Sequence, residues 1–295
     1  MNKYTVILFY KFINIENPQA LRDEQKALCK ELGLLGRVLV SGEGINGTLE
    51  GETLAIEKYQ EALKKNSLFS DLVFKRSKGN GQAFTKLEIK VRSEAVTLGA
   101  GTFNIAEETA PTLTAEELEA MYQKDEDFIV LDLRNDFEIE VGRFEKTFDP
   151  GLRNFRDLPN KLKELKEAKE LKGKKVVTVC TGGIRCEKAT CLLKRHGFDN
   201  LYQLKDGIHT YMEKFPTSHF KGSLYVFDNR LTDPLTDSSE REIIGRCSYC
   251  SSLTESFYSD DNVRPSRKVI CCEECFNQRR DVLRSCRPPE EVVRE

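Results

Sequence analysis

The sequence predicts a protein of mixed α/β and α+β class, built from two folded domains and a small cysteine-rich tail. Three observations predict it. Strand and helix patterns follow one another in the order βαββαβ over residues 1–108, and apolar runs typical of strands buried on both faces alternate with helices over 111–216. Six of the ten cysteines lie in residues 217–295. A chain of 295 residues also exceeds the length of one typical domain.

In the first segment, hydrophobic periodicity predicts strands over 4–12, 37–41, 45–49 and 72–76 and helices over 18–32 and 52–65. This order is typical of a ferredoxin-like or acylphosphatase-like sandwich. Residues 84–98 add extended structure. The run Gly42-Glu43-Gly44-Ile45-Asn46-Gly47 matches the dinucleotide fingerprint, but it precedes a strand-like segment instead of opening a helix. We therefore interpret these glycines as hairpin and bulge positions that need positive φ, and nucleotide binding is the alternative.

In the second segment, Thr114 and Glu117 form a capping-box pattern that opens a short helix. Buried strands are predicted over 128–131, 175–179 and 201–204, and helices over 157–171 and 187–196. Alternation of this kind predicts a parallel sheet. The tail has too little apolar periodicity to bury a core of its own, so we expect a metal or a docking surface to order it.

Composition and hydrophobic pattern indicate the cellular compartment in which the protein is expected. The net charge is −2, and no run of 18 apolar residues is present, so no membrane span is expected. The apolar start of the chain is short and predicts a strand instead of a signal peptide. We expect a cytoplasmic protein whose cysteines are reduced and serve as ligands or nucleophiles.

The loop after the strand over 175–179 carries the strongest chemical signal. Its sequence is Cys180-Thr181-Gly182-Gly183-Ile184-Arg185, and a predicted helix follows. Ligands of open α/β sheets bind beyond the carboxyl ends of strands, where Cys180 lies. A helix N-terminus and a nearby arginine lower a thiol pKa from about 8.5 to roughly 3.5–7.5, and the glycines allow backbone N–H groups to turn toward an anion. We predict that Cys180 is the nucleophile and that Arg185 supports it.

The alternatives for this loop are a buried structural cysteine and a phosphatase cradle. The second is disfavoured because four residues separate Cys180 from Arg185, whereas a phosphate cradle needs five. Cys186 is a candidate resolving cysteine for an oxidised Cys180, or else a space-filling residue. We expect Asp132 and Arg134 to form a structural ion pair that holds the loop.

Residues 111–216 resemble a single-domain rhodanese. The resemblance rests on the Cys180 loop, on Asp132-Leu133-Arg134 and on the late turn Leu204-Lys205-Asp206-Gly207-Ile208. Gly142-Arg143-Phe144 departs from the Gly-His-Ile that many rhodaneses carry.

The whole chain resembles a narrower group, the rhodanese-like family of oxygen-dependent tRNA uridine hydroxylases. The features that carry it are the run Ser41-Gly42-Glu43-Gly44-Ile45-Asn46-Gly47-Thr48, the run from Cys180 to Ala189, and the cysteine-rich tail. The resemblance implies conversion of the wobble uridine of certain tRNAs to 5-hydroxyuridine with molecular oxygen. It also implies that this reaction requires Cys180. It implies tRNA, bound at the anticodon stem-loop, as the partner; we expect neither DNA nor a membrane.

The tail holds two C-x2-C pairs separated by 21 residues, a spacing typical of structural zinc sites. We predict that the four ligands are Cys247, Cys250, Cys272 and Cys275, with Cys271 as a rival for Cys272. Four sulfur ligands leave no open position, so the zinc would have a structural role. We find no motif for a flavin, haem or iron cofactor.

Residues 264–287 are rich in cations: Arg264, Arg267, Lys268, Arg279, Arg280, Arg284 and Arg287 against Glu273, Glu274 and Asp281. We expect a helix after Cys275 that presents Arg280, Arg284 and Arg287 on one face as candidate RNA contacts. A solvated helix face is the alternative.

Two functional classes compete with a tRNA hydroxylase. One is a sulfurtransferase that carries a Cys180 persulfide to a macromolecular acceptor, and the other is a catalytically idle binding module. The intact Cys180 loop disfavours the binding module, and the domains on both sides of it indicate a macromolecular substrate.

Overall fold

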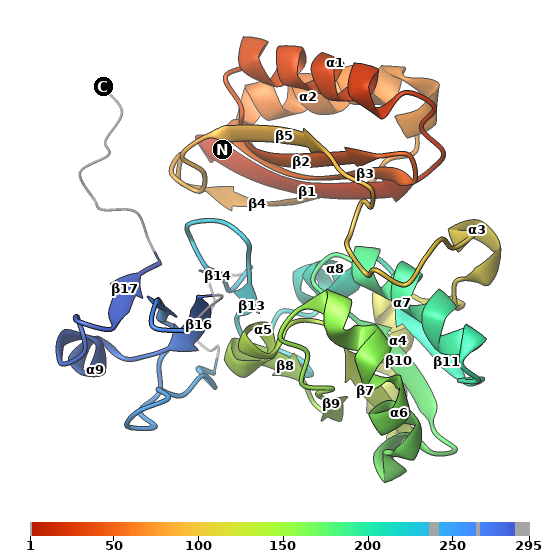
Figure 1. Ribbon diagram of the computed structural model, residues 1–295, viewed down its shortest axis with the longest axis vertical. Coiled ribbons are helices and arrows are strands. Elements are labelled where there is room, and N and C mark those ends of the chain that lie inside the picture. Colours follow the sequence, from red (N-terminus) through yellow and green to blue (C-terminus); the bar gives the residue numbers. More distant parts are fainter. Residues whose placement is uncertain (1, 236–241, 264–265, 287–295) are drawn as a thin grey trace. The chain divides into compact units, whose positions relative to one another are not determined.

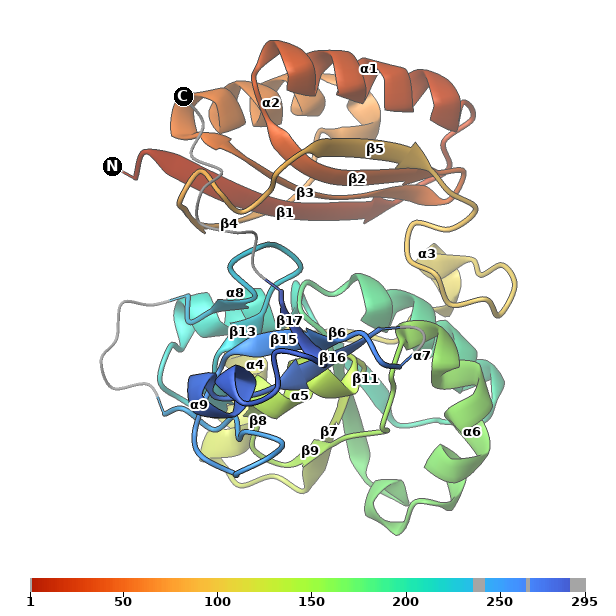
Figure 2. The same cartoon turned by 60° about the vertical axis from the view of Figure 1, so that its left-hand side comes forward.

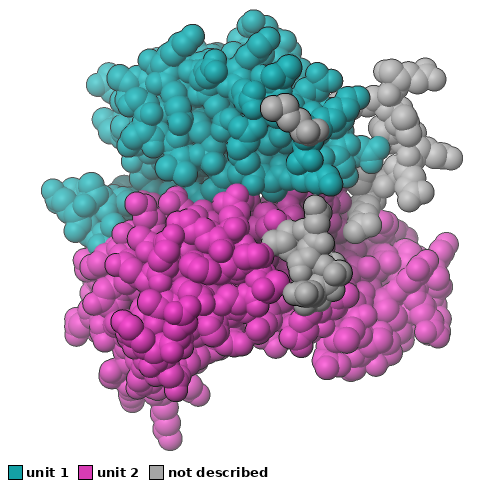
Figure 3. Space-filling model, turned by 180° about the vertical axis from the view of Figure 1, so that it is seen from behind, with its two compact units in different colours: residues 1–109 teal, residues 110–295 magenta. Residues whose placement is uncertain are grey.

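The computed structural model describes residues 2–235, 242–263 and 266–286. They form two compact units, residues 1–109 and 110–295 (Figure 3). The predicted segments 111–216 and 217–295 therefore lie within one unit. None of the helices in the described ranges combines the length and the apolar character that a membrane span requires.

The first unit is a five-stranded sheet with two helices on one face (Figures 1 and 2). Its elements are β1 (Tyr4–Phe12), α1 (Pro18–Glu31), β2 (Leu35–Ser41), β3 (Gly44–Glu52), α2 (Thr53–Lys65), a 3₁₀ turn (Ser67–Phe69), β4 (Phe74–Gly79), β5 (Leu87–Val91) and α3 (Ile105–Glu108). The sheet order is β4-β1-β3-β2-β5, in which only β2 and β5 pair in parallel. The βαββαβ order is confirmed, and the extended segment after it supplies the fifth strand.

The core of the first unit lies between the sheet and its helices. Helix α1 begins at Pro18 because the Asn17 side chain accepts a hydrogen bond from the Ala20 N–H. Helix α2 buries Tyr59, whose hydroxyl donates to Gln25 at 2.7 Å. Burial of the apolar faces of both helices against the strands stabilises the unit.

The glycine-rich run of the first unit has a structural role. It forms the β2–β3 hairpin, and Gly47 lies inside β3, so no helix N-terminus is available for a pyrophosphate. The nucleotide alternative is wrong. Gly44 has φ +150°, as expected, but Gly47 is needed for space: a Cβ there would lie 2.5 Å from the Phe9 ring. Glu43 accepts a hydrogen bond from the Ala95 N–H at 2.8 Å and ties the hairpin to the loop after β5.

The second unit is built on a parallel sheet with the order β6-β11-β10-β7-β9. Its elements up to residue 214 are β6 (Thr112–Leu113), α4 (Ala115–Gln123), β7 (Phe128–Asp132), α5 (Asp136–Val141), β8 (Gly142–Phe144), β9 (Thr147–Phe148), a 3₁₀ turn (Phe155–Asp157), α6 (Leu158–Glu167), a 3₁₀ turn (Lys169–Leu171), β10 (Lys175–Val179), α7 (Ile184–Arg195), β11 (Leu201–Leu204) and α8 (Gly207–Lys214). The predicted parallel sheet and the capping box at Thr114 are confirmed.

Two predicted helices have different bounds. The helix expected over 157–171 is interrupted at Ala168, whose extended backbone ends α6. The helix expected from Glu187 begins earlier, at Ile184, because Gly183 adopts a left-handed conformation and serves as its N-cap. The earlier start places the N-terminus of α7 within the loop that begins at Cys180.

The remaining elements of the second unit are short. They are β12 (Phe220–Gly222), β13 (Leu224–Tyr225), β14 (Thr232–Asp233), β15 (Phe257–Asp260), β16 (Arg267–Ile270), α9 (Glu273–Asn277) and β17 (Leu283–Ser285). Strand β12 pairs with β8, and Phe220 joins the core of the parallel-sheet part. The tail is thus ordered in part by packing against the parallel-sheet part of the second unit, in agreement with the expected docking surface.

The prediction that Arg280, Arg284 and Arg287 share one helix is wrong. Helix α9 ends at Asn277, and the chain then forms β17, which pairs with β15 and contains Arg284. Arg280 lies between the two elements. Arg264 and Arg287 lie outside the described residues.

Candidate functional site

Cys180 lies at the carboxyl end of β10, between that strand and α7. The Gly183 N–H donates to the Cys180 sulfur at 3.1 Å, and the N–H groups of Arg185 and Cys186 also point to it. These groups lie at the N-cap and in the first turn of α7, where the helix dipole favours a negative charge; the Cys186 N–H also donates to the Gly183 carbonyl at 3.0 Å. The local sequence therefore builds a cradle for a thiolate.

The loop that begins at Cys180 packs against the start of α8. The N–H groups of Ile208 and His209 donate to the carbonyl oxygens of Cys180 and Thr181, each at 3.0 Å. Gly207 has φ +72°, and a Cβ there would lie 2.7 Å from the Cys180 oxygen and from the backbone of Gly183. Only glycine permits this approach, so the late turn fixes the shape of the loop.

Two buried ion pairs surround the loop. Arg185 binds both carboxylate oxygens of Glu138, at 2.6 and 2.9 Å, and also donates to the Thr181 hydroxyl at 3.0 Å. Asp132 and Arg134 form the predicted pair at 2.6 Å, and neither side chain is exposed. Because each cation is paired with a carboxylate, the two pairs carry no net charge. Hydrogen bonds to the Cys180 sulfur therefore act together with the nearby charge of Arg185 to stabilise the thiolate.

The pKa of Cys180 is lowered to about 5. Burial of the thiol is the largest influence and raises the pKa, but it is outweighed by a hydrogen bond from the Cys186 thiol, by the charge of Arg185 and by the backbone N–H groups. The pKa of Cys186 is raised, first by burial and then by the same contact with Cys180. At neutral pH, therefore, Cys180 is a thiolate and Cys186 keeps its proton.

Cys180 is fully buried. A substrate atom can reach its sulfur only after neighbouring groups move. The imidazoles of the chain contact groups other than the Cys180 sulfur. His219 stacks on Tyr122 and bonds to Glu145, His209 Nδ1 lies 3.4 Å from a Glu213 carboxylate oxygen, and His196 Nδ1 lies 2.9 Å from the Leu192 carbonyl oxygen.

The hydrogen bond from Cys186 makes a testable contribution to this pKa. Replacing Cys186 by alanine removes the donor, so the pKa of Cys180 should rise above about 5. Because only the thiolate reacts, the midpoint of the alkylation rate against pH should move upward; quantitative mass spectrometry of the Cys180 peptide measures it.

Two control variants complete this test. Cys186→Ser retains a donor and should keep a low midpoint. Cys191→Ala removes a buried cysteine of the same helix, whose thiol bonds to the Glu187 carbonyl, and should not shift it. An unchanged midpoint in Cys186→Ala would contradict the hydrogen-bond assignment.

Sequence reasoning missed Glu138 and Phe227. Glu138 has a readable signal, because Asn135 and Glu138 occupy the first and last positions of a capping-box pattern directly after the Asp132–Arg134 element, and the Asn135 N–H donates to the Glu138 carboxylate at 2.9 Å. Phe227 has none. Its ring centroid lies 5.9 Å from the Arg185 guanidinium carbon, although 41 residues separate the two in the chain.

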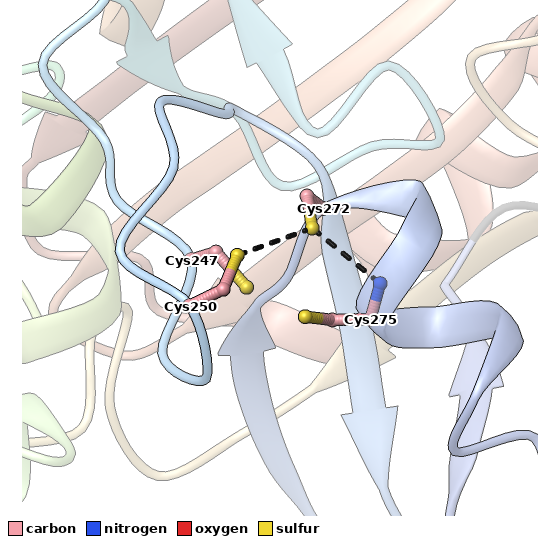
Figure 4. A group of neighbouring side chains, drawn as sticks. All are labelled: Cys247, Cys250, Cys272 and Cys275. Atoms are coloured by element: carbon pink, nitrogen blue, oxygen red, sulfur yellow. Dashed lines mark hydrogen bonds between the residues drawn. The ribbon is translucent and has the colours of Figure 1, made fainter.

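The second group of interest is the cysteine cluster of the tail. The sulfur atoms of Cys247, Cys250, Cys272 and Cys275 all lie within 4.8 Å of one another (Figure 4). The first pair sits in a turn before β15, and the second at the start of α9, where the Cys272 sulfur accepts a hydrogen bond from the Cys275 N–H at 3.5 Å. A tetrahedral ion with metal–sulfur bonds of about 2.3 Å needs sulfurs roughly 3.8 Å apart. The four thiols thus fit one metal ion.

Cys271 lies outside this group. Its thiol is buried and donates to the Cys272 carbonyl at 3.3 Å. The spacing argument that favoured Cys272 over Cys271 agrees with this geometry.

Three family models match the chain. They are the UPF0176 acylphosphatase like domain over residues 4–95, the rhodanese-like domain over 114–214 and the rhodanase C-terminal model over 221–288. A curated protein of Bacillus licheniformis named tRNA uridine(34) hydroxylase is 39% identical over 97% of this chain and 87% of its own. The chain belongs to the tRNA uridine(34) hydroxylase family. The predicted family and fold class are thereby confirmed.

A second curated relative agrees with this membership. A tRNA uridine(34) hydroxylase of Bacillus pumilus is 40% identical over 96% of this chain and 87% of its own. Among solved structures, a rhodanese-like domain protein of Staphylococcus aureus aligns with 34% of this chain and 92% of its own, at 23% identity and a TM-score of 0.29.

Proposed function

We propose that this protein hydroxylates uridine 34, the wobble base of tRNA, to 5-hydroxyuridine, with molecular oxygen as co-substrate and in the cytoplasm. The observation that carries the proposal is a thiolate-stabilising loop in a chain that matches curated hydroxylases over nearly its whole length. Cys180 is the proposed nucleophile toward the uracil ring. Arg185 and Glu138 hold the loop in shape, and Cys186 supplies a proton to the hydrogen bond that keeps Cys180 ionised.

The sulfurtransferase alternative is not favoured, because the curated relatives carry the name of a hydroxylase. A persulfide on Cys180 remains chemically compatible with the same cradle. An assay that supplies thiosulfate and measures sulfur transfer therefore belongs beside the hydroxylation assay.

Incubation of the purified protein with tRNA, oxygen and a two-electron reductant such as a small dithiol tests the function; one oxygen atom enters the base at C5, and the reductant converts the other to water. Mass spectrometry of digested nucleosides should find 5-hydroxyuridine with a tRNA that has uridine 34. None should form with the same tRNA carrying cytidine 34, or without oxygen. Persulfide transfer together with no 5-hydroxyuridine would overturn the proposal in favour of a sulfurtransferase.

We further propose that the cysteine cluster holds one structural zinc ion through four thiolates. Bound there, zinc would tie the turn before β15 to α9 and stabilise the tail; it takes no part in the reaction. Zinc is favoured over harder cations because all four donors are sulfur.

Metal analysis of the native protein should find about one zinc per chain. Cys272→Ser should lose it, because three thiolates bind zinc more weakly than four. Cys271→Ser is the matched control, since it removes the neighbouring thiol from outside the cluster and should retain the metal. Equal metal content in the two variants would contradict the ligand set.

Arg280 and Arg284 are proposed RNA contacts even though no helix joins them. Both side chains are exposed, and the Arg284 guanidinium donates to the backbone carbonyl of Arg280 at 2.5 Å, which places the charge of Arg284 beside residue 280. Within the described residues, neither forms an ion pair with a carboxylate. Two exposed cations four positions apart in the chain and without carboxylate partners favour binding to phosphates.

Arg280→Glu/Arg284→Glu should weaken binding of an anticodon stem-loop RNA and flatten its dependence on salt, because fewer counterions are released. Fluorescence anisotropy at several salt concentrations measures both. Lys163→Glu/Lys166→Glu, which reverses two exposed lysines of α6, applies the same charge change elsewhere. Equal losses of affinity in the two double variants would contradict a direct RNA contact, because the arginines would then affect binding only through the net charge of the protein.

A further inference from the structure

An exposed aromatic side chain lies beside the Cys180 loop. Phe227 belongs to the turn between β13 and β14, and its side chain is 47% exposed. Its ring centroid is 5.9 Å from the guanidinium carbon of Arg185, which donates to Thr181 in the loop. The tail therefore contributes an aromatic ring to the surroundings of the reactive thiol.

The turn that carries Phe227 is rigidly built. The Val226 N–H donates to the Leu231 carbonyl at 2.9 Å, which closes the turn. Inside it, buried Asp228 accepts from the Arg230 N–H at 2.9 Å and from two guanidinium nitrogens at 2.9 and 2.6 Å. Arg230 also reaches Asp233 at 2.6 Å. Such a charge-assisted network fixes the backbone on both sides of the ring.

The ring itself is also held in place. The ring of Tyr225 packs edge to face with Phe227 at 5.2 Å, and it packs in the same way with Phe137 and Phe257 at 5.0 and 5.1 Å. Phe137 precedes Glu138, the partner of Arg185. One aromatic cluster thus anchors both the loop-holding carboxylate and the exposed phenyl ring.

We propose that Phe227 is the stacking platform for the uracil base that the site presents to Cys180. The inference rests on the proposed function and adds a substrate-positioning residue to it. A base taken out of its stack loses contacts with its neighbours, and enzymes that act on such bases restore them with aromatic side chains. A pyrimidine offers a flat π-face to a phenyl ring, and each base–aromatic contact contributes roughly ten- to hundredfold to affinity.

The alternative role for Phe227 is simply to cover Arg185 and Tyr225. The two roles make different predictions: only a stacking residue should make the affinity for RNA depend on the presence of the base at position 34. We therefore compare two anticodon stem-loop RNAs, one with uridine 34 and one with an abasic site at position 34. Their affinities for the full-length protein are measured without oxygen, so that no turnover occurs.

The wild-type protein should bind the uridine RNA roughly ten- to hundredfold more tightly than the abasic RNA. In Phe227→Ala this preference should disappear, with both RNAs binding like the abasic RNA to the wild type. Phe227→Trp should keep the preference, and Phe227→Leu, which is apolar but not aromatic, should lose most of it. Leu253→Ala, which truncates another exposed apolar residue of the tail, should leave it unchanged.

Equal weakening of both RNAs by Phe227→Ala would overturn the inference and leave Phe227 a structural residue. An undiminished preference in that variant, or no preference in the wild type, would overturn it as well. If the wild type makes 5-hydroxyuridine in any of these cases, the proposed function stands. Failure of the wild type to make 5-hydroxyuridine overturns the proposed function instead.

Discussion

Replacing Cys180 by serine should abolish formation of 5-hydroxyuridine in tRNA while leaving the protein folded. Serine fills nearly the same volume at this buried position, so the packing of the loop should persist. Its hydroxyl, however, does not ionise near neutral pH, whereas the pKa of Cys180 is about 5. The nucleophile is therefore lost although the cradle around it remains. Nucleoside mass spectrometry of tRNA treated with the purified variant measures the outcome.

Cys191→Ser is the control for this substitution. Cys191 is buried on α7, and a serine hydroxyl can keep its hydrogen bond to the Glu187 carbonyl, so activity should be retained. Hydroxylation at the wild-type level by Cys180→Ser would show that the reacting group lies elsewhere.

Replacing Arg134 by methionine should destabilise the second unit by about 3–5 kcal/mol, because it leaves the Asp132 carboxylate buried without its partner. The carbonyl of Gly142, which accepts from Arg134 at 2.6 Å, also loses its donor. Hydrogen–deuterium exchange should become faster in β7 and β10, which pair beside the ion pair. Strand β1 of the first unit serves as an internal reference.

Two further variants separate the buried charge from side-chain truncation in general. Lys161→Met breaks a solvent-exposed pair with Glu164 and should change the free energy of unfolding by less than about 1 kcal/mol. Adding Asp132→Leu to Arg134→Met removes the unpaired charge, so the double variant should be more stable than Arg134→Met alone. Equal losses in Lys161→Met and Arg134→Met would contradict the argument from burial.

The fold was predictable wherever local pattern and tertiary packing agree. The strands and helices of the first unit follow from periodicity, since each buries one face against its neighbours. The tail helix was mispredicted because the spacing of Arg280 and Arg284 fits a helix as well as an exposed strand. What decides between them is the pairing of β17 with β15, more than twenty residues away, and such pairing leaves no local signal.

The candidate site was predictable to the extent that it is local. Cys180 and Arg185 share one loop, and the strand before it and the helix after it indicate its chemistry. Glu138 reaches Arg185 from 47 residues away, and Phe227 approaches from the tail. These two contacts neutralise Arg185 and place an aromatic ring beside it. They depend on tertiary structure, which the spacing of residues along the sequence does not reveal.

Strand β12 has a consequence for where the chain can be divided. It pairs with β8 through Phe220, Lys221 and Gly222, and the Ser223 N–H donates to the Val141 carbonyl at 2.9 Å. A fragment that stopped at residue 216 would leave the backbone groups of β8 without this partner. Open strand edges recruit strands from other molecules and seed aggregation. The natural end of a soluble rhodanese fragment of this protein therefore lies beyond β12, inside the segment that the sequence alone assigned to the tail.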